Sequence, residues 1–315
     1  MFEQGLPEQY TQPKNWLWGE FENARHAILR FGKLSLHKNP LAHIVFVEGL
    51  GEYAEKKFEL ARDFNKISCN FSILDRQGQG KSTRYFPNAP HKQHSQGVDH
   101  DIADLVQYCK EHIPENEPIV LLGQSTGGLI ALLALEEHKD LFKAAILSSP
   151  LLGIKDPRIK GKEALFSSIP IFDCIKEMYV PGGGDWKPRS HPEKMHNPED
   201  FSSHPDRSLI NDYWPENDPD LRAGDPTIGW LWHMCKAITK IRNPETLKNI
   251  TQPVLIISNG DDVLIDNTPI DAIVSQLPNG LHTHHIKGKH DSLMEDDRIR
   301  NQNLKEIEHL LKNSL

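Results

Sequence analysis

The chain has 315 residues, with 36 lysine and arginine residues against 44 aspartate and glutamate residues and a formal net charge of −8. This length allows a large domain with an insertion, and an acidic balance without a basic stripe argues against a nucleic-acid partner. The four cysteines form no C-x-x-C pair, which is typical of reduced thiols in the cytoplasm. Since neither a signal peptide nor an apolar run of ~20 residues is evident, we expect a cytoplasmic protein with at most peripheral contact with the inner face of a membrane.

Short apolar runs alternate with helical patterns along most of the chain. Strands buried on both faces and separated by helices indicate a mostly parallel sheet. The predicted strands are residues 27–31, 44–47, 71–74, 119–122, 144–147, 254–257 and 281–286. The predicted helices are residues 54–65, 99–112, 127–138, 268–276 and 297–312.

This alternation stops between about Pro150 and Pro253. The stretch contains many prolines, three consecutive glycines and four of the six tryptophans. A structureless loop of such length inside a compact domain is implausible. We therefore expect a core formed by residues 1–150 and 251–315, interrupted by a mainly helical cap of residues 151–250. The alternative is an unrelated second domain.

The segment Gly123-Gln124-Ser125-Thr126-Gly127 follows a predicted buried strand and precedes a predicted helix. It fits the pattern G-x-S-x-G, in which a serine stands on a strained turn so that its Oγ projects above the sheet. The flanking glycines let strand and helix pass closely, and the helix N-terminus supplies free N–H groups for an oxyanion. We expect Ser125 to be a catalytic nucleophile, the alternative being a glycine-rich turn without chemistry.

A serine nucleophile needs a base to take its proton, and the base needs an orienting acid. The expected order along the chain is serine, acid and histidine, with the histidine after the last strand. His290 is in that position and is the predicted base. The turn after the strand 254–257 offers three carboxylates, of which we favour Asp262, followed by Asp261 and then Asp266.

The oxyanion hole of such a site needs two N–H donors. We expect one from Thr126, directly after the nucleophile. The other is expected from Leu50, because glycines in the loop 48–52 leave its backbone free to point an amide inward.

His282, His284 and His285 form a cluster in the last predicted strand. A metal site is one interpretation of this cluster. Polar residues on an edge strand are the interpretation that we favour, because no acidic or thiol partner has suitable spacing. We therefore expect no metal and no cofactor.

In the segments that contain the predicted site residues, the chain resembles the monoacylglycerol lipase and lysophospholipase L2-like branch of the α/β-hydrolases. This branch typically shows H-G-x-x-E, D-x-x-G-x-G-x-S, a late D-x-x-x-D and a histidine loop followed by acidic residues. Here the corresponding segments are residues 48–52, 75–82, 262–266 and 290–295, and residues 225–231 resemble the L2-type cap. The resemblance spans roughly residues 25–312 and implies an α/β-hydrolase fold, with a mostly parallel central sheet flanked by helices and an inserted helical cap.

One departure from this branch is Glu48, which stands where the usual residue is histidine. That histidine is not a member of the triad, so the chemistry expected of Ser125 is unaffected. Glu48 can hold the oxyanion loop in its place by accepting backbone N–H bonds, on the condition that it stays ionised.

The resemblance implies a serine hydrolase that cleaves a monoacyl lipid ester, either a lysophospholipid or a monoacylglycerol, through an acyl-enzyme. Ser125 would attack, His290 would move the proton and Asp262 would orient it. The alternatives are a short-chain carboxylesterase or acyltransferase, and a non-catalytic binding protein of the same fold. The sequence assigns no oligomeric state and no further substrate-binding residue.

The predicted cap contains more large apolar residues than a compact insertion of its polarity needs. We expect some of them to pack within the cap and the others to line an acyl tunnel that opens at Ser125. The absence of a basic cluster in the cap favours neutral or zwitterionic head groups. The apolar residues are Leu165, Phe166, Ile169, Ile171, Phe172, Ile175, Met178, Trp230, Leu231, Trp232 and Met234.

Overall fold

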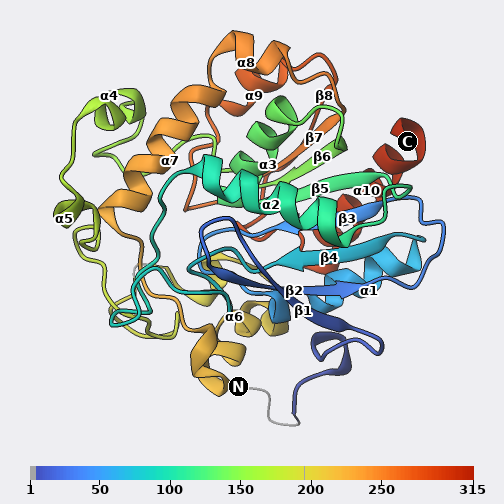
Figure 1. Cartoon of the computed structure of the whole chain (residues 1–315), viewed down its shortest axis with the longest axis horizontal. Helices are drawn as coiled ribbons and strands as arrows, with labels where there is room; N and C mark the ends of the chain where they lie inside the picture. The colour runs from blue at the N-terminus through green and yellow to red at the C-terminus, as the bar shows by residue number, and fades with distance from the viewer. Residues whose placement is uncertain (1–4, 195) are drawn as a thin grey trace.

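The computed structural model of the chain describes residues 5–194 and 196–315. Within these residues, eight strands form one central sheet (Figure 1). The strands are β1 Leu17–Glu22, β2 Ile28–Leu34, β3 His43–Val47, β4 Asn70–Leu74, β5 Ile119–Gln124, β6 Phe142–Ser148, β7 Val254–Asn259 and β8 Gly280–His285. Their order across the sheet is β1-β2-β4-β3-β5-β6-β7-β8. β1 pairs with β2, and β2 with β4, in antiparallel orientation. All the other neighbouring strands pair in parallel, so the sheet is mostly parallel as predicted.

Helices cover both faces of the sheet, because the strands between them are apolar on both sides. All five residues of β3 are buried. Val45 and Val47 face the core that contains α2 and α3, whereas Ile44 and Phe46 face the core that contains α1 and α10. The core helices are α1 Phe58–Lys66, α2 Val98–His112, α3 Thr126–Glu137, α9 Ile270–Val274 and α10 Asp297–Ser314.

Each predicted strand and helix is present, with shifted ends, and the predicted helix 54–65 begins as the 3₁₀ turn η2 Ala54–Lys57. Strand β1 is not predicted by the sequence pattern. Most of its residues are exposed, and Gly19 interrupts the apolar alternation. A Cβ on Gly19 would lie 2.3 Å from the ring of Phe31 in β2, so this glycine permits the close pairing of the two strands.

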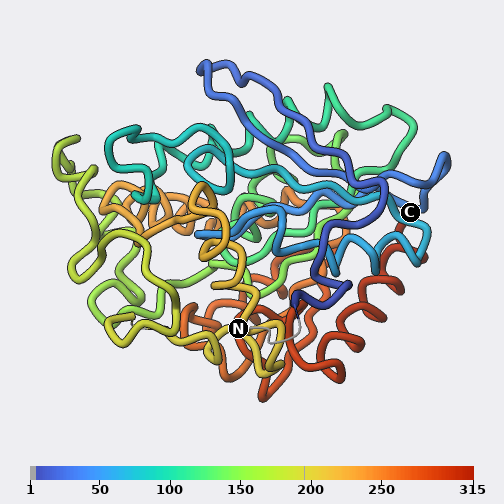
Figure 2. The backbone as a smooth tube through the Cα atoms, turned by 90° about the horizontal axis from the view of Figure 1, so that it is seen from below, coloured from blue at the N-terminus to red at the C-terminus, as the bar shows by residue number. Residues whose placement is uncertain are grey.

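The described part of the segment between β6 and β7 adds no strand to the sheet. The regular elements of its described part are α4 Glu163–Ser168, α5 Asp173–Lys176, η3 Pro198–Asp200, α6 Pro205–Asn217, η4 Pro219–Leu221, α7 Ile228–Ile241 and α8 Pro244–Lys248. In Figure 2 most of this segment, coloured from lime to orange, gathers at one side of the molecule, away from the red helix α10. The fold is therefore a sandwich of helices and sheet with one large helical insertion.

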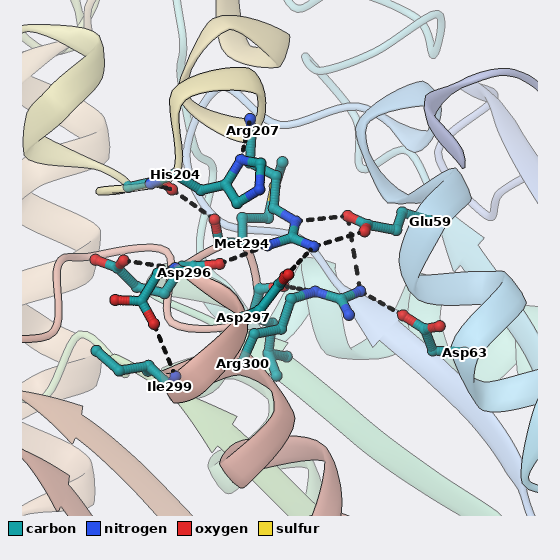
Figure 3. A network of polar contacts seen from close by, with 12 residues as sticks. Glu59, Asp63, His204, Arg207, Met294, Asp296, Asp297, Ile299 and Arg300 are labelled. Atoms are coloured by element: carbon teal, nitrogen blue, oxygen red, sulfur yellow. Dashed lines mark hydrogen bonds and ion pairs between the residues drawn. The ribbon is translucent and has the colours of Figure 1, made fainter. Parts of the chain in front are cut away.

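A cluster of ion pairs fixes part of this insertion to the core (Figure 3). Arg207 of α6 donates two hydrogen bonds of 2.8 Å to Glu59 of α1 and one of 2.9 Å to Asp297 at the start of α10. Arg300 of α10 pairs with Asp63 of α1. Both arginines are buried, so these bonds hold α6 against two core helices on the same side of the sheet.

Candidate active site

The site lies at the carboxyl ends of the parallel strands, where open α/β sheets usually bind ligands. The loops after β3, β5 and β8 meet at a cavity of about 460 Å³. Ser125, His290, Leu50 and Thr126 all line this cavity. Asp262, from the loop after β7, reaches the site through its contact with His290. The five site residues predicted from the sequence therefore come together in space.

Ser125 stands on a strained turn between β5 and α3. Its φ of +52° lies in the left-handed region, which costs a residue other than glycine roughly 1–3 kcal/mol. The surrounding backbone holds this conformation: the Ser125 N–H donates to the carbonyl of Ser148 at 3.0 Å. The Ser125 carbonyl accepts from Gly128 at 3.0 Å and from Leu151 at 2.8 Å. The turn is thus bonded on both sides to neighbouring elements.

The glycines on either side of Ser125 allow α3 to approach the sheet directly. A Cβ on Gly127 would lie 1.9 Å from the carbonyl oxygen of Val47 at the end of β3. A Cβ on Gly123 would lie 2.4 Å from the carbonyl oxygen of Gly127. Both clashes involve backbone atoms, so side chains at these positions would push α3 away from β3 and β5.

His290 and Asp262 form a buried, hydrogen-bonded pair. The His290 Nδ1–H donates to Asp262 Oδ2 at 2.7 Å, and both side chains are at most 4% exposed. Asp262 Oδ1 accepts from the N–H groups of Leu264, at 2.8 Å, and Ile265, at 3.2 Å. Burial opposes its ionisation, but the charge of His290 and these donors hold the pKa of Asp262 below 3.8. Burial also opposes the charging of His290, but Asp262 raises the pKa of the imidazole above 6.5.

The other two candidate carboxylates lie in different surroundings. Asp261 is exposed, and its N–H donates to the carbonyl of Gly288. Asp266 pairs with Lys160 at 3.1 Å and accepts from the hydroxyl of Thr268 at 2.8 Å. Of the three carboxylates, Asp262 is the one that contacts His290, which favours it as the orienting acid.

In the oxyanion loop, residues 48–52, the peptide groups on both sides of Leu50 are hydrogen-bonded. The Gly49 N–H donates to Glu52 Oε2 at 2.8 Å, and the Gly51 N–H donates to Gln79 Oε1 at 2.7 Å. The Gly49 carbonyl accepts from Gln79 Nε2 at 2.9 Å. Within residues 5–194 and 196–315, the Leu50 N–H has no acceptor. This amide is therefore left available for a ligand in the cavity.

Thr126 provides a second available amide. It is the first residue of α3, where backbone N–H groups have no intrahelical acceptor. The positive end of the helix dipole lies at the same place. Two N–H groups, from Leu50 and Thr126, thus lie beside Ser125, as an oxyanion hole requires.

Glu48, the first residue of this loop, is fully buried. It accepts hydrogen bonds from the N–H of Arg76 at 3.3 Å and from Gln79 Nε2 at 3.1 Å. The expectation that it accepts a backbone N–H is confirmed. Burial and the neighbouring Asp75 raise the pKa of Glu48 well above 4.5, which opposes the ionised form that the expectation requires.

A closed ring of buried polar side chains connects the three loops of the site. Lys57 Nζ pairs with Glu52 at 2.6 Å and donates to Gln124 Oε1 at 3.1 Å. Lys56 Nζ pairs with Glu52 at 3.1 Å and with Asp291 at 2.7 Å. The amide of Gln124 donates to Asp291 and closes the ring. Burial opposes the ionisation of Glu52, but the two lysines hold its pKa below 4.5.

We did not identify this ring from the sequence, although two signals in the sequence point to parts of it. Lys56 follows Glu52 at the i,i+4 spacing of ion pairs on helices, and Asp291 is adjacent to His290. The meeting of these residues with Gln124 depends on the tertiary fold. The ring joins the oxyanion loop, the residue before the nucleophile and the residue after the histidine.

Eleven apolar residues of the insertion were expected to supply both a small cap core and part of the lining of an acyl tunnel. Of those eleven residues, Trp230 is the one that lines the cavity, and Met234 is buried in the core. Five others, which lie in or next to the short helices α4 and α5 and which we call the apolar patch, are 40–78% exposed: Leu165, Ile169, Phe172, Ile175 and Met178. The other large apolar residues at the cavity are Leu50, Leu151, Val180, Trp186, Phe201, Leu221, Leu264 and Ile265.

The insertion also places cationic side chains at the cavity. Three of these are paired with carboxylates: Arg158 with Asp156, Lys187 with Glu193, and Lys194 with Asp225. Arg189 differs, because within residues 5–194 and 196–315 no carboxylate lies within ion-pair distance of it. Its guanidinium lies 3.6 Å from the ring centre of Phe201, which makes an edge contact with His290. No pattern in the sequence indicates this position for Arg189.

The histidines of β8 bond to nearby polar groups. His282 and His284 share a face of the strand and each bonds to the hydroxyl of Ser258 at 2.8 Å. His285 lies on the opposite face, is buried and bonds to Asn303 at 2.6 Å. In the described part of the chain, no group of three histidine, cysteine or acidic side chains is arranged to hold a metal ion.

Comparison with known proteins agrees with this architecture. The chain is 28% identical over 275 residues to the probable lysophospholipase L2 of Haemophilus influenzae, covering 85% of this chain and 83% of that protein. It is 26% identical over 270 residues to lysophospholipase L2 of Escherichia coli K12, covering 82% and 76% respectively. A soluble variant of the monoglyceride lipase of Saccharomyces cerevisiae, solved with a substrate analogue, superposes with a TM-score of 0.73 at 16% identity over 96% of each chain.

This structural likeness shows the α/β-hydrolase fold. The model of the family described as serine aminopeptidase, S33, matches residues 38–297, a range that includes both ends of the site, from the oxyanion loop to the histidine loop. Because the match covers most of the chain, the protein belongs to the S33 family of α/β-hydrolases.

Proposed function

We propose that the protein is a serine hydrolase that cleaves the ester of a monoacyl lipid, and that a lysophospholipid suits its site better than a neutral monoacylglycerol. The observation that carries the hydrolase assignment is the convergence of the strained Ser125 and the His290–Asp262 pair on one cavity. The likeness to proteins named lysophospholipase L2 supports the choice of a lipid ester.

The proposed reaction proceeds through an acyl-enzyme. Ser125 Oγ attacks the acyl carbon while His290 Nε2 takes the hydroxyl proton, and the N–H groups of Leu50 and Thr126 bind the resulting oxyanion. When the intermediate collapses, the bond to the leaving alcohol breaks and His290 gives its proton to that alcohol. A water molecule, activated by His290 in the same way, then releases the fatty acid and restores Ser125.

Asp262 determines which nitrogen of His290 can act as the base. Its carboxylate holds the proton on Nδ1, which leaves Nε2 as the acceptor. The same carboxylate stabilises the imidazolium that forms when Ser125 loses its proton. The two neighbouring N–H donors keep Asp262 oriented through the cycle.

Arg189 supports a phosphate-containing head group. It lines the cavity, its charge is not neutralised by a carboxylate of the described chain, and it packs on Phe201 next to His290. A guanidinium fork matches the geometry of a phosphate, whereas a glycerol head group would leave its charge unpaired. We therefore narrow the expected neutral or zwitterionic head groups to those that carry a phosphate.

We further propose that residues 151–250 act as a cap over the core of residues 1–150 and 251–315, and that the cap contacts a lipid surface. The described residues contain no helix long and apolar enough to cross a bilayer. The apolar patch lies on this insertion, and the exposed Lys160 and Lys162 precede α4 beside it. Exposed apolar side chains next to lysines are typical of surfaces that insert into an anionic membrane interface.

The proposed acid is tested by Asp262→Asn, with Asp261→Asn as the matched control. Losing the carboxylate leaves His290 in the wrong tautomer, so we expect kcat to fall by ~10⁴ in the first variant and to change little in the second.

Since the neutral imidazole is the active form and Asp262 raises its pKa, kcat/KM of the native enzyme should rise with pH through a midpoint above 6.5. This midpoint should move to lower pH in Asp262→Asn. Greater damage from Asp261→Asn would contradict the assignment.

The substrate class is tested with monoacyl esters of increasing chain length, each as a lysophospholipid and as a monoacylglycerol. We expect kcat/KM to rise about fourfold for each CH₂ that is buried, and diacyl lipids to be poor substrates.

The lysophospholipid should react faster than the monoacylglycerol of the same acyl chain, and Arg189→Ala should reduce that preference. Highest turnover on acetyl esters would indicate a short-chain carboxylesterase, and highest turnover on aminoacyl amides would indicate a peptidase.

Contact with a lipid surface is tested by co-sedimentation with vesicles of phosphatidylglycerol and phosphatidylethanolamine. The double variant Leu165→Ser, Phe172→Ser removes two side chains that are 65% and 78% exposed, so we expect the fold to persist and binding to fall at least about fivefold. The control is Leu281→Ser, at a residue of β8 that is 50% exposed. Equal binding of all three proteins would contradict the proposed contact.

A further inference from the structure

We propose that Glu48 is a positioning residue that works as a neutral acid. Its carboxylic proton is donated to the carboxylate of Asp75, and the resulting pair holds the oxyanion loop in the shape that leaves the Leu50 N–H available. This inference rests on the proposed hydrolase function. Glu48 does not touch the substrate in this account and acts only through the loop.

The first observation is that Glu48 and Asp75 directly follow a pair of residues on neighbouring parallel strands, Val47 of β3 and Leu74 of β4. Both side chains are fully buried, at 0% exposure. Ionised carboxylates are acceptors only, so two of them cannot form a hydrogen bond with each other. Two neighbouring carboxyl groups in a buried site repel each other when both are ionised, so we place one proton between Glu48 and Asp75.

The surroundings of Asp75 assign the negative charge to that residue. Asp75 Oδ2 accepts from Arg30 Nε at 2.6 Å and from the N–H of Lys81 at 2.9 Å, and Oδ1 accepts from the N–H of Ala54 at 3.0 Å. Arg30 also pairs with Glu55 at 2.6 Å. An arginine and two backbone donors stabilise a carboxylate far better than they stabilise a carboxylic acid.

The surroundings of Glu48 assign the proton to Glu48. Its Oε2 accepts from two neutral donors, Arg76 N–H and Gln79 Nε2, and its Oε1 accepts from no group of the described chain. An oxygen that is buried and accepts nothing is well placed to carry a proton. The charged groups that influence Glu48 are Asp75 and Glu52, which favour the protonated form, and the cationic Arg76 and Arg84, which oppose it.

Gln79 transmits the state of Glu48 to the oxyanion loop. Its Nε2 donates both to Glu48 Oε2 and to the Gly49 carbonyl, and its Oε1 accepts from the Gly51 N–H. The amide of Gln79 therefore fixes the peptide groups on both sides of Leu50. If Glu48 lost its proton, repulsion from Asp75 would move its carboxylate, and the Gln79 amide would lose one of its fixed partners.

The test compares Glu48→Gln with Glu48→Ala. A glutamine has the shape of the neutral acid: its NH₂ can donate to Asp75, and its carbonyl can accept from Arg76 and Gln79. We expect Glu48→Ala to lower kcat about tenfold or more with little change in KM, since displacing an oxyanion donor weakens only the transition state. Glu48→Gln should restore at least about half of the native kcat.

The pH profile separates this role from a merely structural one. The neutral form of Glu48 is the active form, so kcat of the native enzyme should fall reversibly as the pH rises through the raised pKa of Glu48, in a range where the protein stays folded. Glu48→Gln has no proton to lose at this position and should lack that alkaline decline. A Glu48→Gln variant as impaired as Glu48→Ala, or with an unchanged alkaline limb, would overturn the proposal.

Infrared spectroscopy tests the protonation state without any substrate. The native protein at pH 7 should show the C=O stretch of a buried protonated carboxyl group, and Glu48→Gln should lose this band. Glu163→Gln is the control, because Glu163 is an equally buried acid that is paired with Arg242. A band of unchanged intensity in Glu48→Gln would show that Glu48 is ionised, because other buried carboxyl groups contribute equally to both spectra. This outcome would leave the hydrolase assignment untouched, so failures of the two proposals can be told apart.

Discussion

The whole site depends on the close approach of α3 to the sheet, with Ser125 in a left-handed backbone conformation. The contact is so tight that a single Cβ on Gly127 would lie 1.9 Å from the carbonyl oxygen of Val47. This packing brings three groups close together: the serine hydroxyl, the Thr126 amide and the end of β3 from which the oxyanion loop begins. The conformational strain at Ser125 persists because its N–H and carbonyl are bonded to neighbouring elements.

The ring of buried polar side chains holds the oxyanion loop and the histidine loop in position relative to the nucleophile. It contains two lysines and two carboxylates, with Gln124 between them, so its formal charge is zero. Desolvating charges is costly, and removing one member would leave its partner unpaired in the interior. The ring therefore contributes mainly by fixing the positions of the loops rather than by adding stability. It connects Glu52, Gln124 and Asp291, which lie next to the oxyanion loop, the nucleophile and the histidine, in one hydrogen-bonded unit.

Features set by local spacing were predictable from the sequence, and features set by tertiary surroundings were not. The elbow at Ser125 and the buried strands beside it follow from patterns of consecutive residues. The edge strand β1 escaped prediction because it is largely exposed and contains Gly19. Apolar character alone could not show that Phe172 faces outward while Arg189 lines the cavity. Nor could the sequence reveal that Glu48 and Asp75 are both buried at the ends of two neighbouring strands, since the pairing of β3 with β4 is set by the fold.

The most direct test of the central claim is covalent labelling with a fluorophosphonate, followed by mass spectrometry of the intact protein and of its peptides. A fluorophosphonate reacts with a serine that a neighbouring base has activated, in a site that stabilises an oxyanion. The account predicts one label per chain, located on Ser125, and no label in a folded Ser125→Ala variant, whose kcat should fall by ~10⁶. A label on a different serine, or undiminished labelling of Ser125→Ala, would contradict the assignment of this cavity as the active site.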